Sequence, residues 1–102
     1  MIGVKKIPKN QLQDGLVDLI QVTPVTLTTG GWSLVSGFYE YNYSNANIES
    51  TSVIDIIPEN ASAGVFKLAG ILPSTLNSLG SIKIYATNLP SSNMTVTINI
   101  IN

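Results

Sequence analysis

The sequence contains no cysteine, no histidine and no arginine. Without cysteine the chain has no disulfide and no thiolate, so its stability must come from packing or from association. Without histidine, the commonest general base, it has neither a serine–histidine pair nor an imidazole metal ligand. Charged residues make up 11% of the chain, less than half of the usual share of about 25%. These absences predict a protein that is not an enzyme and that binds no metal or cofactor.

The acidic residues do not form an obvious catalytic set. They lie in separate segments of the chain: Asp14, Asp18, Glu40, Glu49, Asp55 and Glu59. Two carboxylates that met across a sheet would give the pair used by glycosidases. Asp55 interrupts an apolar run, and we expect it to be paired or to lie at a sheet edge. Gly30 and Gly31 lack the glycine spacing of a phosphate-binding loop.

All five basic residues are lysines, and three of them, Lys5, Lys6 and Lys9, lie within the first nine positions. No basic stripe continues beyond them, so the clustered cations that bind phosphates are missing. No apolar run approaches the roughly 20 residues that cross a membrane, and residues 1–10 lack the apolar core of a signal peptide. We therefore expect no nucleic-acid partner, no membrane insertion and synthesis in the cytoplasm.

The first 21 residues have a different pattern from the rest. Asn10 stands where a helix cap would, and apolar residues then recur at helical spacing: Leu12, Leu16, Leu19 and Ile20. A helix of about ten residues is not stable alone in water. This stripe must pack against the domain, against copies of itself or against a larger body. Residues 22–31 contain Pro24, which suits a linker or an edge strand.

Beyond Val22 the pattern is that of strands. The clearest alternation is in MTVTINI, where four apolar residues alternate with polar ones: Met94, Val96, Ile98 and Ile100. Residues 81–87 alternate as well, residues 59–70 suit a short helical turn, and residues 71–80 resemble a loop. Short strands at close spacing predict an all-β fold, a small antiparallel β-sandwich or barrel, preceded by a short helical or extended N-terminal segment.

Three tyrosines, Tyr39, Tyr41 and Tyr43, share one face of a predicted strand because they occupy alternate positions. As a sugar-binding platform they would have to be exposed together, and such aromatic stripes are uncommon on monomers. Tyrosine is enriched where apolar packing meets water, as at subunit interfaces. We favour a half-buried face or a contact between subunits.

The order of these features resembles the small β-sandwich knob at the ends of many bacteriophage fibres. A tryptophan is followed by GFYEYNYS, SVIDIIPENAS, FKLAGILP, GSIKIYATNLP and MTVTINI. The matching positions are Trp32, Tyr39, Pro58, Ala69, Gly70, Gly80, Ala86, Pro90, Val96, Ile98 and Ile100. The resemblance implies a jelly-roll-like sandwich, a homotrimer packed about an axis with an N-terminal shaft, and no catalytic residues.

The segment before the knob is shorter than the shaft of long tail fibres, which favours a short head fibre that decorates the capsid. We therefore predict an anchor at residues 1–21, a neck or linker at 22–31 and the knob at 32–102. The residues predicted to dock onto a capsid or other virion protein are Ile2, Val4, Lys5, Lys6, Ile7 and Lys9. The residues predicted at the trimer interface are Leu12, Leu16, Leu19, Ile20, Tyr39, Tyr41 and Tyr43.

On this hypothesis the protein is made in the host cytoplasm and lies on the virion surface, where the knob attaches weakly to the host or to a cell-surface glycan. One alternative is a receptor-binding protein of a tail fibre or baseplate, which shares the fold and the trimer. Another is a monomeric carbohydrate-binding module that uses the tyrosine face.

Overall fold

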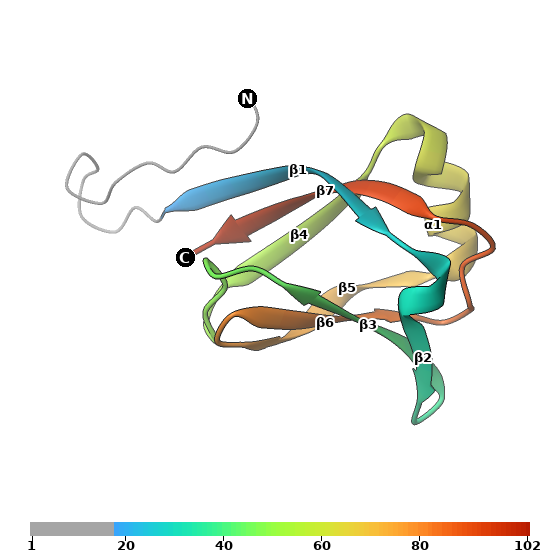
Figure 1. The fold of residues 1–102 in the computed structure, drawn as a ribbon, viewed down its shortest axis with the longest axis horizontal. Coiled ribbons are helices and arrows are strands. Elements are labelled where there is room, and N and C mark those ends of the chain that lie inside the picture. The colour runs from blue at the N-terminus through green and yellow to red at the C-terminus, as the bar shows by residue number, and fades with distance from the viewer. Residues whose placement is uncertain (1–17) are drawn as a thin grey trace.

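Two antiparallel sheets face each other in the computed structural model, which describes residues 18–102 (Figure 1). One sheet has three strands in the order β1-β7-β4, and the other has four in the order β2-β3-β6-β5. The strands are β1 (Leu19–Leu27), β2 (Trp32–Val35), β3 (Phe38–Ser44), β4 (Val53–Pro58), β5 (Ile71–Ser78), β6 (Ser81–Ala86) and β7 (Met94–Ile101). The predicted fold class, an all-β antiparallel sandwich, is confirmed.

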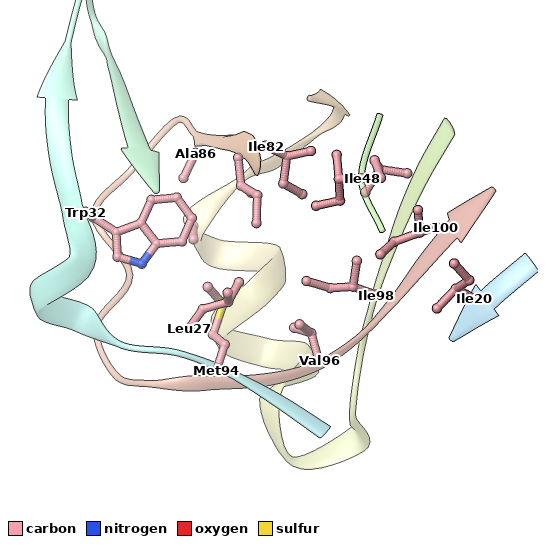
Figure 2. Packing of buried hydrophobic residues seen from close by; sticks show 13 residues of the cluster. Ile20, Leu27, Trp32, Ile48, Ile82, Ala86, Met94, Val96, Ile98 and Ile100 are labelled. Carbon is pink, nitrogen blue, oxygen red and sulfur yellow. The ribbon is translucent and has the colours of Figure 1, made fainter. Parts of the chain in front are cut away.

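The core lies between the sheets and is built on strict alternation along the two central strands. In β7 the inward residues Met94, Val96, Ile98 and Ile100 are fully buried, and in β6 the same holds for Ile82, Ile84 and Ala86. Figure 2 shows these two rows together with Trp32 and with Ile48 from the β3–β4 connection. Because successive side chains of a strand point to opposite faces, the residues that alternate with each buried row lie on the outer side of its sheet.

Three short helical segments connect the strands: η2 (Thr29–Gly31), η3 (Asn60–Ser62) and α1 (Ala63–Ala69). The helical turn predicted near residues 59–70 is therefore confirmed. α1 ends at Gly70, whose φ of 64° is left-handed and easy only for glycine. The terminal carbonyls of α1 accept bonds from the β6–β7 loop, since Asn88 donates to Ala69 O at 2.9 Å and to Leu68 O at 3.1 Å. These bonds satisfy groups that a helix end leaves free.

β1 corrects the predicted boundaries. The sequence predicted a helical stripe up to Ile20 and a neck at 22–31, but Leu19–Leu27 pairs along its length with β7. Ile20 and Leu27 fill the core, at 2% and 0% exposure. Pro24 is tolerated because β1 is an edge strand with an irregularity between Val22 and Val25. The knob therefore includes the predicted neck and does not begin at Trp32.

β5 is a second correction, because residues 71–80 were predicted to be a loop. Ile71–Ser78 instead forms the edge of the four-stranded sheet and pairs with β6. The register shifts between Ile71 and Thr75, a stretch that includes Pro73. An irregularity at an edge lets a strand contain proline without breaking the central ladder.

Polar bonds gather at the end of the sandwich where β1 begins and β7 ends. The backbone N–H of Asn102 donates to Asp18 O at 2.9 Å, and its side chain donates to Asn47 O at 3.1 Å. The Ser52 hydroxyl donates to the Asn102 side chain and accepts from the Glu49 N–H. These contacts hold the start of β1 beside the end of β7.

Candidate functional site

The tyrosine row of β3 faces the core. Tyr39, Tyr41 and Tyr43 lie opposite Ala86, Ile84 and Ile82 of β6, all of which are fully buried. The three rings are half-buried and pack against the core cluster. The Tyr43 hydroxyl lies near the surface, where it accepts a bond from the Asn45 side chain at 3.2 Å.

This placement agrees with the half-buried tyrosine face that the sequence favoured, and it bears on four of the predicted interface residues. The three tyrosines and Ile20 contribute to the core of their own chain, so none of them forms an open face for a partner or for a sugar. Leu19 is half-buried and, as the neighbour of inward-facing Ile20, points outward. The remaining interface residues, Leu12 and Leu16, lie outside the described residues. So do all of the predicted docking residues: Ile2, Val4, Lys5, Lys6, Ile7 and Lys9.

The base of the β2–β3 hairpin is held by several close contacts around Tyr41. The rings of Trp32 and Tyr41 meet at a centroid distance of 5.2 Å with a tilt of 55°, a favourable arrangement for aromatic pairs. Gly31 makes room for Tyr41, because a Cβ on Gly31 would lie 2.2 Å from the ring. The N–H of Thr28 donates to the Tyr41 hydroxyl at 3.4 Å. The hairpin is thus held to the core by one packed cluster.

The tip of the same hairpin is exposed and apolar. β3 pairs with β6 only from Tyr39 onward, so residues 34–38 project past the sheet (Figure 1). Leu34, Val35 and Phe38 have exposures of 65%, 43% and 41%. The turn between the strands has positive φ at Ser36 (51°) and Gly37 (88°), as in the type I′ turns of two-residue hairpins. A rigid base with a projecting apolar tip suits a contact site for another molecule.

A groove of about 310 Å³ lies between the edge strands β4 and β5 beside α1. Its lining is mainly apolar and includes Ile56, Phe66, Ile71 and Leu72. Asp55 is its one carboxylate, and the exposed position of this residue on an edge strand agrees with the edge placement expected from the sequence. A single carboxylate does not make the acid and base pair of a glycosidase.

Within residues 18–102, no group of three or more histidine, cysteine, aspartate or glutamate side chains is placed to hold a metal ion. No helix in the same range has the length and apolar character needed to cross a bilayer. The described surface presents apolar side chains at the hairpin tip, hydroxyls and amides on the sheets, and few charges.

Comparison with protein-family models, with curated proteins and with solved structures found no match to the chain. The resemblance to fibre knobs stays a prediction that rests on the order of motifs along the sequence.

The sequence did not single out the hairpin tip. Leu34, Val35 and Phe38 looked like ordinary strand residues, because the sequence does not show how far β6 accompanies β3. One signal was present: Ser36-Gly37 between two apolar runs is a two-residue connection of the kind that makes a tight hairpin.

Proposed function

We propose that the chain is a non-enzymatic structural protein of a bacteriophage virion, a short homotrimeric head fibre. The segment before β1 anchors it to the capsid or to another virion protein, and the sandwich is presented outward for weak attachment to the host, for example to a glycan. A receptor-binding protein of a tail fibre or baseplate would use the same fold and trimer.

The observation that carries this proposal is the placement of the two ends. The start of β1, where residues 1–17 join, lies at one end of the sandwich beside the end of β7 (Figure 1). The β2–β3 hairpin follows from the far end of β1 and projects at the opposite end, with Leu34, Val35 and Phe38 exposed. A protein anchored by the first end would therefore display the second.

Charge supports the same division. Residues 18–102 carry five carboxylates and two lysines, whereas residues 1–17 carry three lysines and one aspartate. The N-terminal segment is thus basic and the sandwich acidic. A basic segment with apolar residues such as Ile2, Val4 and Ile7 suits docking onto an acidic surface of a larger assembly.

The test is incorporation of charge-reversed chains into particles of the phage that encodes the protein. Lys5→Glu, Lys6→Glu and Lys9→Glu, combined in the full chain, should reduce its amount in purified particles at least tenfold. Lys67→Glu, an exposed lysine of α1, is the matched control and should leave incorporation unchanged. Mass spectrometry of purified particles measures both. Equal incorporation of the triple variant would contradict the anchor, and absence of the unaltered chain from particles would contradict the virion role.

The monomeric carbohydrate-binding module is the less favoured function, because the tyrosine row that would bind the sugar faces the core.

Attachment through the hairpin tip is open to a direct test. Phe38→Ser in the full chain should weaken binding of particles to host cells while incorporation stays normal. Unchanged cell binding would place the attachment site elsewhere on the sandwich.

A further inference from the structure

We propose that the free edge of β4 and the groove beside it bind an extended peptide segment of another protein. The segment adds to the three-stranded sheet as a fourth strand, antiparallel to β4. Its chemistry is an apolar residue on each side of a lysine or arginine. This inference goes beyond the proposed function and depends neither on the virion role nor on the trimer.

Among the four edge strands that the structure describes, β4 has the most regular edge. β1 contains Pro24 and β5 contains Pro73, and both strands shift register near the proline. β2 has only four residues. Proline, irregular register and short length are features that keep an edge strand from pairing. β4 differs, because every residue from Val53 to Pro58 pairs with β7 without a shift and its proline stands only at the end.

The backbone groups of β4 point toward β7 and away from it in turn. In an antiparallel ladder, alternate residues exchange hydrogen bonds with the partner strand. The N–H of Glu59, just after β4, donates to Thr95 O at 2.9 Å. Counted back from that bond, Asp55 directs its N–H and C=O toward β7. The N–H and C=O groups of Ile54 and Ile56 therefore lie along the free edge.

This edge is closed at one end and open along the rest. At the closed end the Asn77 side chain of β5 donates to Ser52 O, the residue before β4. No other hydrogen bond within residues 18–102 reaches the edge-side backbone groups of Ile54 and Ile56. In an antiparallel addition each of these two residues would exchange both of its bonds with one residue of the added strand.

The groove of about 310 Å³ lies beside the same edge and is suited to the side chains of the added strand. Residues that pair directly across two strands point to the same face. The partners of Ile54 and Ile56 would therefore point inward, over the groove. There they would meet Phe66, Ile71 and Leu72, which are half-buried in the chain alone. Apolar side chains at these two positions would bury the groove lining.

Asp55 selects the residue between the two apolar ones. It lies between Ile54 and Ile56, points to the outer face, is exposed, and has no ion pair within residues 18–102. Glu59, also exposed, adds a second negative charge at the end of the strand. Opposite charges that pair across two strands stabilise the pairing, and like charges destabilise it. The residue opposite Asp55 is therefore a lysine or an arginine.

The test uses the full chain and a synthetic peptide with this pattern, acetyl-TVKVT-amide. Its two valines would lie opposite Ile54 and Ile56, and its lysine opposite Asp55. NMR measures how fast the amide hydrogens of Ile54 and Ile56 exchange with water. At about 1 mM peptide both rates should fall at least threefold, because bound chains do not expose these amides. The matched peptide acetyl-TVEVT-amide should bind at least about threefold more weakly.

Charge reversal on the protein gives the complementary test. Asp55→Lys should reverse the preference, so that the glutamate peptide binds more tightly than the lysine peptide. Glu49→Lys makes the same change of charge at an exposed residue outside β4 and the groove, and it should keep the preference for lysine. Thermal unfolding verifies that both variants are folded. Asp55→Asn, which should abolish the preference, serves as the second variant if Asp55→Lys does not fold.

Methylated peptides separate strand addition from simple filling of the groove. Methylation of the backbone nitrogen of a valine removes a donor to β4 and should weaken binding at least threefold. Methylation of the lysine nitrogen changes an N–H that points away from β4 and should have little effect. Equal loss from the two methylations would mean that the peptide does not add as a strand, which would overturn the inference.

Two further results would overturn it. The first is unchanged exchange at Ile54 and Ile56 in the presence of the lysine peptide. The second is slow exchange of these amides in the protein alone. Slow exchange that depends on protein concentration would mean that a second copy occupies the edge, and slow exchange at every concentration would mean that the chain's own residues do. In each case the virion role keeps its own test by incorporation.

Discussion

The three-stranded and four-stranded sheets alternate inward and outward side chains in the same way, but their outward residues differ in chemistry. The four-stranded sheet presents four serines, the ion pair between Lys83 and Glu40 at 3.5 Å, the ring of Tyr85 and a few aliphatic or aromatic side chains on its outer strands. The three-stranded sheet presents threonines, amides and aliphatic residues with one carboxylate. The alternation of apolar and polar residues therefore explains why both sheets form. The composition of the outward-facing residues indicates what kind of surface each sheet presents.

The inward halves differ as well. The three-stranded sheet buries aliphatic side chains completely, as with Val96, Ile98 and Ile100. The four-stranded sheet combines small buried residues of β6 with the half-buried tyrosines of β3. Large rings beside small partners fill the space between two twisted sheets, and their polar tips reach water at the rim. Tyrosine on this face is explained by packing within one chain.

The largest effect should come from the inward face of the three-stranded sheet. Ile98→Ala removes a fully buried side chain at the centre of the sheet and should lower the free energy of unfolding by about 3 kcal/mol. Ile57→Ala, on the outward face at 51% exposure, should cost less than about 1 kcal/mol. Urea unfolding at one protein concentration measures both. Similar losses at the two positions would contradict the assignment of the faces.

Tyr41 tests the inward face of the four-stranded sheet. Tyr41→Ala removes the ring that packs on Trp32, so the free energy of unfolding should fall by about 2–3 kcal/mol, somewhat less than for a fully buried aromatic residue. Tyr41→Phe keeps the ring and loses only the long bond from Thr28, so its cost should be below about 1 kcal/mol. If Tyr41→Ala left stability unchanged, the tyrosine row would not be part of the core.

Adjacent glycines test the base of the hairpin. Gly31→Ala would place a Cβ 2.2 Å from the Tyr41 ring, whereas Gly30→Ala meets nothing within 4 Å. Because the ring is held against Trp32, we expect Gly31→Ala to cost about 1–2 kcal/mol and Gly30→Ala to be close to neutral. Thermal unfolding of the two variants side by side gives the difference. Equal stability would mean that the ring moves freely and that the base is not rigid.

The smallest effect should come from the outward face of the four-stranded sheet. Lys83→Met breaks the ion pair with Glu40, in which the lysine side chain is 45% exposed and the glutamate side chain 11% exposed. Because the lysine is half in water, the pair contributes little, so the loss should be about 1 kcal/mol, and it should shrink in high salt because of screening. Urea unfolding at low and high salt tests this. A larger, salt-independent loss would mean that this face is not simply solvated.

The sequence predicted the sandwich because its central strands carry the signal. The alternation in Met94–Ile101 and in Ser81–Ala86 is nearly complete, and both strands have a neighbour on each side. Edge strands gave weaker signals. Leu19 and Ile20 fit a helical stripe as well as a strand, and Pro73 with few β-branched neighbours made Ile71–Ser78 look like a loop. Both segments are strands because they pair with a strongly alternating central strand. A local stretch of sequence does not show which segment it will pair with.

The candidate surfaces were less predictable than the fold. Period-2 spacing places Tyr39, Tyr41 and Tyr43 on one face but does not say which face is inward, since β3 carries large side chains on both sides. Phe38 begins β3, but it alternates with the inward-facing Tyr39 and lies beyond the point where β6 ends at Ala86, so its ring is exposed. The length of the neighbouring strand and the choice of the inward face determine these positions, and a local sequence pattern shows neither.

The most direct test of the proposed function is the molar mass of the intact, untagged chain, measured by size exclusion with light scattering over a range of concentrations. We predict the mass of three chains, because fibre knobs of the kind that the sequence resembles are homotrimers. The mass of a single 10.9 kDa chain at every concentration would contradict it.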